Sequence, residues 1–456
     1  MHTHDASTEV LTQAIVRAAV ERVRLDSPPL DAARSAAELM AMTGLTITAD
    51  GIGGLEALRI FTEVLAPACL SVDHQRFLAF VPAAPTEAAT LFDLLVGASS
   101  VYGGSWIEGS GAVHAENQAL RWLADLAGFP SDAGGVFVSG GTAGNLSALI
   151  AARARWRERA DGAFDRTRAL FIGAGNAHSS IAAAGRTMDA DVLLADTDSD
   201  GRLDPVALRA LVAQLSAEDR SRIAAVIATS GSTNAGLIDP LEPVADLAST
   251  LGAWFHVDGA YGAAALAAPS LRARFAGIER ADSYIVDPHK WLFAPFDCCA
   301  LVYREPMQAR RAHTQHAEYL DALHDAHQPE WNPSDFAHHL SRRARGLPFW
   351  FSLATYGTRA YGEAVETSVR VAHEGAELIR SSQHLELVSE PELSVLLFRR
   401  TGFTPADYEA WSARMLADGE AFVVPTAWKG ETVLRLCLVN PRTTLDDLRL
   451  IFDSLA

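Results

Sequence analysis

Short apolar runs alternate with amphipathic stretches through the middle of the chain. Apolar periodicity predicts helices at residues 204–215 and 243–251. Buried strands are predicted at residues 135–138, 169–172, 192–194, 223–228, 254–257 and 283–286. This alternation predicts an α/β fold with a mostly parallel central sheet and helices on both faces. The carboxyl ends of the strands are then the expected place for a ligand.

The two ends of the chain have different patterns. The apolar spacing in residues 7–66 predicts helices. A helical layer of this size cannot cover its own apolar faces, so we expect it to dock on the main body or on another subunit. Towards the C-terminus, a long helix followed by strands near residues 393–399 and 433–439 predicts a small α+β domain. The expected parts are an N-terminal helical segment (residues 1–73), a large α/β domain (residues 74–345) and a small C-terminal domain (residues 346–456).

Two further segments are predicted to be loops. Residues 101–111 are rich in glycine and serine, and the amphipathic helix after them is expected to begin at residue 113. Residues 313–339 are rich in histidine and show no clear periodicity. In this second segment no histidine pair flanks a carboxylate at helical spacing, which argues against a metal site.

Composition and charge narrow the class of protein. The 456 residues are 49% hydrophobic, yet no apolar run reaches the roughly 18 residues that a membrane span needs. The net charge of −18 argues against a nucleic-acid or anionic-membrane partner. The N-terminus lacks a secretory pattern, and the four cysteines fit no zinc spacing. We therefore expect a cytoplasmic protein with free thiols and no metal.

Lys290 is the first candidate for chemistry. It lies in the stretch DSYIVDPHKW, with apolar residues on both sides. Although a lone lysine is usually a solvated surface residue, these neighbours predict partial burial. Burial is expected to lower the pKa of the amine and to make it a nucleophile toward carbonyl groups.

Asp258 supplies a second candidate, because it ends another short apolar strand, in the stretch HVDGAYG. A lysine and an aspartate at the ends of neighbouring strands are the two groups that a pyridoxal phosphate site needs. The lysine forms an imine with the cofactor, and the aspartate keeps the pyridine nitrogen protonated so that the ring accepts electrons.

The turn SGGTAGN, at residues 139–145, follows a predicted strand and opens a long helix. Free N–H groups at the helix start form an anion site, to which Thr142 can add a hydroxyl. The turn has neither the Walker lysine nor the order GxGxxG, which argues against a P-loop or dinucleotide fold. Five polar residues follow predicted strands and are expected at one edge of the sheet: Thr142, His178, Thr229, Asp258 and Lys290.

With these motifs, the chain resembles the group II pyridoxal-phosphate-dependent amino-acid decarboxylases, which include aromatic-amino-acid, glutamate and histidine decarboxylases. The resemblance covers roughly residues 74–442 and rests on HVDGAYG, DPHKW followed by FDCCA, NAHSSI followed by AAAGR, and SGGTAGN. It implies the fold type I architecture of aspartate aminotransferase, pyridoxal 5′-phosphate as cofactor, and a homodimer with active sites shared at the subunit interface.

The resemblance also implies roles for single residues. Lys290 would be the Schiff-base lysine, Asp258 the partner of the pyridine nitrogen, and His178 a stacking residue close to the departing carboxylate. His178 could instead be a helix-cap or core histidine. The remaining cofactor contacts would be Gly141, Thr142, Ser179, Thr229, Ala260 and His289.

The implied reaction converts an L-amino acid to its amine and CO₂. Phe80, Tyr102 and Trp106 favour an aromatic substrate. An acidic or diamino acid remains an alternative substrate, and an aminotransferase or lyase on the same fold remains an alternative enzyme. The predicted substrate pocket consists of Phe80, Ala83, Tyr102, Gly104 and Phe336.

Two residues depart from the pattern of the family. Many relatives carry a loop tyrosine that donates a proton, whereas this chain has Phe336. Relatives with phenylalanine at that place can turn to oxidative decarboxylation–deamination, which releases an aldehyde. The second departure is Asp287, where relatives commonly carry asparagine.

Overall fold

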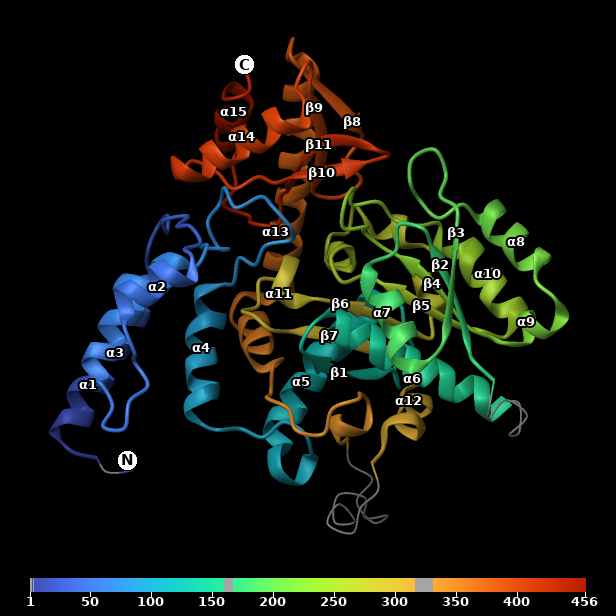
Figure 1. Cartoon of the computed structure of the whole chain (residues 1–456). Coiled ribbons are helices and arrows are strands. Elements are labelled where there is room, and N and C mark those ends of the chain that lie inside the picture. Colours follow the sequence, from blue (N-terminus) through green and yellow to red (C-terminus); the bar gives the residue numbers. More distant parts are fainter. Residues whose placement is uncertain (1, 3, 160–166, 316–330) are drawn as a thin grey trace.

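The computed structural model describes residues 2, 4–159, 167–315 and 331–456. At its centre lies a seven-stranded sheet with the order β1-β7-β6-β5-β4-β2-β3 (Figure 1). The strands are β1 (Gly134–Val138), β2 (Leu170–Ala174), β3 (Asp191–Ala195), β4 (Ile223–Thr229), β5 (Trp254–Asp258), β6 (Ser283–Val286) and β7 (Cys299–Tyr303). Strand β7 is antiparallel to both of its neighbours, and the pairs from β6 to β3 are parallel. Six strands therefore share one direction, which confirms the predicted mostly parallel sheet. The antiparallel strand β7 was not predicted.

Helices cover both faces of this sheet, as predicted. One face packs against α5 (Trp106–Leu126), α8 (Pro205–Gln214) and α10 (Leu241–Leu251). The other packs against α6 (Gly141–Arg159), α7 (Ser179–Met188) and α12 (Pro306–His313). Successive residues of β4 show the alternation, because Val226 belongs to the first core and Ile227 to the second. Shorter elements complete the large unit: α4 (Glu87–Ala98), α9 (Ala217–Ser221) and α11 (Pro288–Trp291).

The loop predicted at residues 101–111 was wrong from residue 106 onward, because α5 begins at Trp106. Ser105 caps this helix, since its hydroxyl accepts the N–H of Glu108 at 3.4 Å and donates to the Glu108 carboxylate at 2.6 Å. The helix is interrupted at Gly109 (φ −143°, ψ 36°), so its glycines concealed the helical pattern. Of the second predicted loop, residues 316–330 lie outside the described residues.

The C-terminal unit is built on an antiparallel sheet with the order β10-β11-β9-β8. Leu78 belongs to its core, and its carbonyl accepts the N–H of Cys437 at 2.9 Å. The long helix α13 (Leu347–Ser381) joins this unit to the large sheet and is interrupted at Gly357, whose φ of 76° suits glycine (Figure 1). The other elements are β8 (Leu385–Ser389), β9 (Val395–Arg400), α14 (Pro405–Ala417), β10 (Pro425–Trp428), β11 (Glu431–Cys437) and α15 (Leu445–Asp453).

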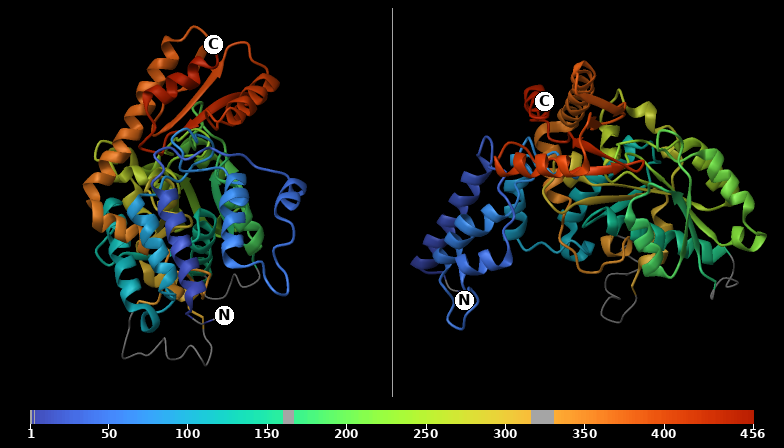
Figure 2. Two further views of the ribbon diagram at one scale, coloured as in Figure 1. Left: turned by 90° about the vertical axis from the view of Figure 1, so that its left-hand side faces the viewer. Right: turned by 45° about the horizontal axis from the view of Figure 1, so that its top comes forward.

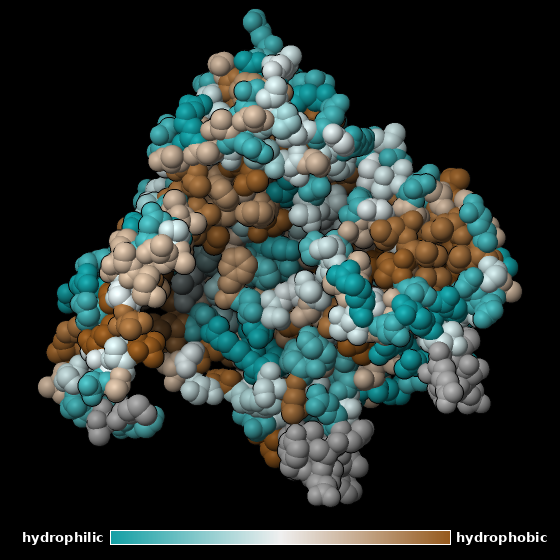
Figure 3. All heavy atoms as spheres, viewed as in Figure 1, coloured by the Kyte–Doolittle hydropathy of each residue, from teal (hydrophilic) through white to brown (hydrophobic). Residues whose placement is uncertain are grey.

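The N-terminal helices stand beside the main body (Figures 1 and 2). They are α1 (Ala6–Val23), α2 (Ala36–Thr43) and α3 (Gly54–Ile60). Helices α1 and α2 contain no buried residue, and apolar side chains gather on this segment (Figure 3). The exposed ones include Val10, Ile15, Val16, Met40, Met42, Leu45, Ile47, Leu55 and Phe61. None of the described helices has the length and apolar character needed to cross a bilayer.

A buried ion pair supports the large unit. Arg342 and Glu116 have side chains only 1% and 2% exposed, and they are joined by two hydrogen bonds of 2.7 Å. Replacing Glu116 with alanine would leave the Arg342 charge buried and unpaired. We expect Glu116→Ala to lower the free energy of unfolding by about 3–5 kcal/mol, measured by urea denaturation.

The matched control for this variant is Glu374→Ala, which breaks the exposed pair of Arg370 and Glu374 on α13. Exposed pairs contribute about 0–1 kcal/mol. If the two variants unfold at the same urea concentration, the buried pair contributes no more to the free energy of unfolding than an exposed pair does.

Candidate active site

The carboxyl ends of β1, β2, β4, β5 and β6 surround a cavity of about 460 Å³. Of the nine residues predicted to be catalytic or to hold the cofactor, eight line it: Gly141, Thr142, His178, Thr229, Asp258, Ala260, His289 and Lys290. The ninth, Ser179, is the first residue of α7 and is exposed. The shared strand direction thus brings together groups that are up to 149 residues apart in the sequence, from Gly141 to Lys290.

Lys290 lies on the short helix α11, next to a carboxylate. Its Nζ is 2.9 Å from Oδ2 of Asp287, a residue that is 1% exposed. Burial by itself lowers the pKa of Lys290, but the charge and hydrogen bond of Asp287, with a smaller contribution from Asp258, outweigh burial and hold that pKa above its usual value. The expected depression of this pKa was therefore wrong. Apolar neighbours indicated burial correctly, whereas the carboxylate three residues earlier was the overlooked signal.

Asp258 is held by a network of buried polar groups. Nδ2 of Asn145 donates to Asp258 Oδ2 at 2.8 Å, and the backbone N–H of Ala260 donates to Oδ1 at 3.2 Å. Oδ1 of Asn145 faces Nε2 of His256 at 2.9 Å, while His256 Nδ1 lies 2.8 Å from the Ser283 hydroxyl. Burial lowers the pKa of His256 to about 4, so the ring is neutral at neutral pH. Asn145 and His256 were missed, although both lie inside the motifs SGGTAGN and HVDGAYG.

His178 both caps a helix and lines the cavity. Its Nδ1 accepts the backbone N–H of Ser180 at 3.2 Å and lies 2.8 Å from the Ser180 hydroxyl. The Ser180 hydroxyl in turn accepts from Asn145 Nδ2 at 2.9 Å. The two interpretations of His178 are therefore compatible, because the cap orients the ring and links it through Asn145 to Asp258.

The start of α6 offers an anion site at one end of the cavity. The N–H groups of its first turn have no acceptor within the helix, and the positive end of the helix dipole points at the same place. A methyl group added to Gly140 would meet only His289, at 3.8 Å, so the backbone leaves room for a bulky anion. Oδ1 of Asn176 and Oδ1 of Asp287 are buried without a partner among the described residues, and both side chains line the cavity. These features fit a phosphorylated cofactor that carries polar groups.

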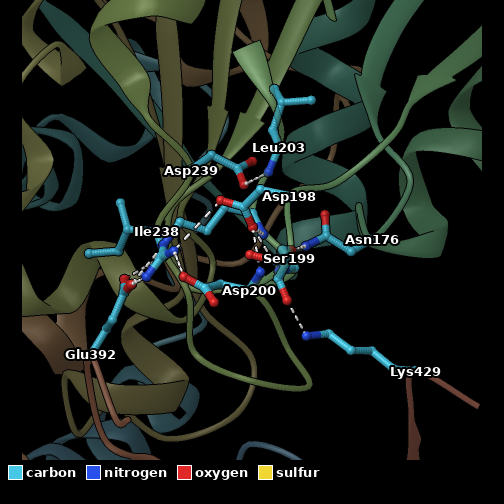
Figure 4. Close-up of polar contacts among 11 residues, drawn as sticks. Asn176, Asp198, Ser199, Asp200, Leu203, Ile238, Asp239, Glu392 and Lys429 are labelled. Carbon is cyan, nitrogen blue, oxygen red and sulfur yellow. Dashed lines mark hydrogen bonds and ion pairs between the residues drawn. The ribbon is translucent and has the colours of Figure 1, made fainter. Parts of the chain in front are cut away.

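The turn at residues 198–202 contacts Asn176, a residue of the cavity lining (Figure 4). Asn176 donates from its side chain to the Gly201 carbonyl, and Asp198 accepts the N–H groups of this turn. The C-terminal unit holds the turn through Lys429, which donates to the Ser199 carbonyl, and through Glu392.

Glu392 and Asp239 lie beside this turn, where Asp239 accepts the N–H of Leu203 at 2.8 Å (Figure 4). Glu392 accepts from Arg202 Nε at 2.8 Å and from the N–H of Ile238 at 3.0 Å. Asp239 accepts the N–H of Thr229 at 2.7 Å. The position of the C-terminal unit is thereby coupled to two residues of the cavity wall, Asn176 and Thr229.

None of the five residues predicted for the substrate pocket lines the cofactor cavity of the single chain. Ala83 lines a second cavity of about 690 Å³, which shares Phe296 with the first. Phe80 is 63% exposed. Phe336 is 2% exposed and stacks on Trp331, with ring centroids 4.0 Å apart.

Tyr102 and Gly104 lie against another part of the chain. The Tyr102 hydroxyl donates to the Leu340 carbonyl at 3.2 Å, and the N–H of Ser334 donates to the Gly104 carbonyl at 3.0 Å. The role of these residues and of Phe336 in substrate binding stays a prediction.

Comparison with known proteins agrees with this geometry. The model of the pyridoxal-dependent decarboxylase conserved domain matches residues 56–401. The aromatic-L-amino-acid decarboxylase of Bacillus atrophaeus is 31% identical over 393 residues, which are 83% of this chain and 79% of the relative. The L-2,4-diaminobutyrate decarboxylase of Rhizobium meliloti (strain 1021) is also 31% identical, over 84% of this chain and 78% of its own.

The chain belongs to the pyridoxal-dependent decarboxylase family. It is a pyridoxal-phosphate-dependent amino-acid decarboxylase, as the motifs implied. A crystal structure of Oryza sativa TDC with PLP and tryptamine superimposes with a TM-score of 0.90 at 24% identity, covering 100% of this chain and 98% of that one. That likeness confirms the fold type I architecture.

Asn145 provides a test of the network around Asp258 in this decarboxylase. Asn145→Ala removes a side-chain hydrogen bond to a buried carboxylate, and such bonds contribute about 1.5–3 kcal/mol. We expect the Kd for pyridoxal phosphate to rise by about 10- to 100-fold, measured by titrating cofactor-free protein and following absorbance.

Ser147→Ala serves as the control on the same helix, because the Ser147 side chain faces His338 and lies outside the cavity lining. We expect this variant to bind the cofactor as the unaltered enzyme does. Equal affinities for the Asn145 and Ser147 variants would show that Asn145 does not support the site.

Proposed function

We propose that this decarboxylase acts on an aromatic L-amino acid and releases the corresponding amine and CO₂. The observation that carries the proposal is the aromatic lining of the 690 Å³ cavity, which adjoins the cofactor cavity at Phe296. Phe296 lines both of them, and Phe293, Tyr356 and Tyr361 line the larger one. This cavity can receive a flat apolar side chain while the α-carbon lies beside Lys290 and His178. The Bacillus relative supports the same substrate class by its name.

This reaction gives a role to several residues of the cofactor cavity. When bound, pyridoxal phosphate accepts electrons from the α-carbon of the substrate through its protonated pyridine ring. Asp258, oriented by Asn145, holds the proton on the pyridine nitrogen. The N–H groups at the start of α6 hold the phosphate, and Thr142 adds a hydroxyl. Lys290 supplies the amine that attaches the cofactor.

His178 has a separate task on the substrate side. Its ring is held at the start of α7 by Ser180, so it can cover the bound ring system and keep water from the carboxylate that leaves.

A diamino acid is the second candidate substrate. Glu87 lines the larger cavity, where its carboxylate could bind a second ammonium group. The relative from Rhizobium meliloti, named for 2,4-diaminobutyrate, supports this alternative. The aldehyde alternative has less support, because the ring of Phe336 is buried against Trp331 in its own chain.

A product assay separates these functions. We expect the purified enzyme with pyridoxal phosphate to convert one or more aromatic amino acids to equal amounts of amine and CO₂. The panel contains the common L-amino acids and L-2,4-diaminobutyrate. Turnover of diaminobutyrate alone would reject the aromatic proposal. Aldehyde, ammonia and peroxide in place of amine would establish the oxidative reaction.

The chain contains two lysines, Lys290 and Lys429, which give a matched pair of variants. We expect Lys290→Ala to abolish turnover, because the cofactor loses its attachment. Lys429 lies outside the cavity lining, and Lys429→Arg keeps the positive charge next to the Ser199 carbonyl, so we expect it to change turnover by only about 0.5 kcal/mol, roughly twofold in rate. A Lys290→Ala variant with full turnover would overturn the assignment.

We further propose that the enzyme is a cytoplasmic homodimer with active sites shared between subunits. The exposed apolar side chains of α1 and α2 support a docking face for the second copy. Cys69, Cys298, Cys299 and Cys437 are all free, which suits a reducing compartment.

The dimer has its own test. Light scattering on the full chain is expected to give twice the chain mass of 48.8 kDa. Ile15→Asp, which places a charge on the proposed face, should weaken the dimer. Gln13→Asp adds the same charge at a polar position of α1 and is the control. A monomer at all concentrations would reject this assembly.

A further inference from the structure

We propose that Asp287 is a positioning residue that holds Lys290 as an ammonium ion in the cofactor-free enzyme and thereby controls how fast the cofactor is captured. The inference rests on the proposed role of Lys290 in attaching the cofactor. It assigns to Asp287 a task that is separate from those of Asp258 and His178.

The chain itself places the two groups together. Asp287 directly follows β6 and precedes the first residue of α11, so Lys290 lies three residues later on the same helical turn. The distance from Asp287 Oδ2 to Lys290 Nζ is 2.9 Å. The Asp287 side chain is 2% exposed and that of Lys290 is 23% exposed. Solvent therefore screens this pair poorly, so each charge strongly stabilises the charged form of the other group.

Lys290 is the main cation available to Asp287. The other basic neighbour is His289, whose Nε2 lies 3.6 Å from Asp287 Oδ2. Burial lowers the pKa of His289, which favours its neutral ring. The Cys299 thiol also helps to lower the pKa of Asp287, but it is a neutral group, so the compensating positive charge comes mainly from Lys290.

The other titratable groups that face Lys290 cannot replace Asp287. Asp258, on β5, attracts the ammonium group less than Asp287 does, and its oxygens already accept from Asn145 and Ala260. Burial raises the pKa of the Cys299 thiol on β7 and of the Cys437 thiol on β11, so both groups are uncharged at neutral pH. Removing Asp287 would therefore leave burial as the dominant influence on the amine.

The consequence lies in the chemistry of attachment. A neutral amine attacks the aldehyde carbon of pyridoxal phosphate with its nitrogen lone pair, and the carbonyl oxygen leaves as water. An ammonium ion has no free lone pair, so its proton must first pass to Asp287 or to solvent. By stabilising the ammonium form, Asp287 slows cofactor capture at neutral pH. Capture becomes faster as the pH rises, because a larger fraction of Lys290 is then neutral.

The presence of two lysines in the chain makes the test direct. Cofactor-free enzyme with ¹³C- and ¹⁵N-labelled lysine gives two side-chain signals by NMR, and Lys429→Arg assigns them. We expect Lys290 to be protonated at pH 7 in the unaltered chain. In Asp287→Asn the titration midpoint of Lys290 should fall, whereas Asp287→Glu should restore part of the shift.

Asp282→Asn is the matched control. Asp282 directly precedes β6, at its opposite end, and its carboxylate pairs with Arg155, so the Lys290 midpoint should not move. In stopped-flow absorbance measurements at pH 7, Asp287→Asn should capture pyridoxal phosphate several-fold faster than the unaltered chain. Its profile of capture rate against pH should shift to lower pH.

Three results would overturn the inference. They are a neutral Lys290 at pH 7 in the unaltered enzyme, an unchanged or higher Lys290 midpoint in a folded Asp287→Asn variant, and an equal shift in Asp282→Asn. The first needs no variant, so it decides the matter even if Asp287→Asn fails to fold. An enzyme that releases no product while Lys290 titrates as expected would reject the proposed function and leave this inference standing.

Discussion

Six strands of the central sheet run in one direction, and the site depends on this constraint. Because β7 is antiparallel to both β1 and β6, it lets β1 end at the same edge as the parallel strands. The turn after β1, the loop after β2 and the ends of β4, β5 and β6 therefore meet around one cavity. Helices on both faces exclude water from the strands, so the polar groups at this edge are partly removed from solvent. The fold thereby creates the low-dielectric environment in which single charges have large effects.

Two carboxylates in this environment have different partners and hence different properties. Asp258 accepts hydrogen bonds from the neutral groups Asn145 and Ala260, which leave its negative charge available to a bound cation. Asp287 is compensated by the ammonium group of Lys290, so the cofactor-free cavity already contains an ion pair. A protonated pyridine ring would supply the positive charge that Asp258 lacks. The aldehyde of the cofactor would have to react with the Lys290 amine, which is paired with Asp287. The two functions of the cavity therefore depend on different carboxylates. Asp287 is the counter-ion of the lysine that would attach the cofactor, and Asp258 would be the counter-ion of the ring that withdraws electrons.

Much of the site could be predicted because its residues follow strands in short motifs. The positions of Lys290, Asp258, His178 and Thr142 came from strand ends, and the structure places all four around one cavity. Asn145 and His256 were harder to predict, since a buried amide or imidazole resembles any core polar residue until its partner is known. The start of α5 was missed because its first turns contain Gly109 and Gly111, which weaken the helical pattern.

The sequence by itself determined the fold class, the cofactor and the candidate for attachment, because these follow from periodicity and from motifs of adjacent residues. Only the tertiary structure decided the charge state of Lys290. Apolar neighbours predicted a lowered pKa, whereas the folded chain places Asp287 Oδ2 2.9 Å from the amine and reverses the sign. It also decided that Phe336 is a core residue stacked on Trp331. Burial can be inferred from local composition, but the effect of burial on a charge depends on which partner is buried with it.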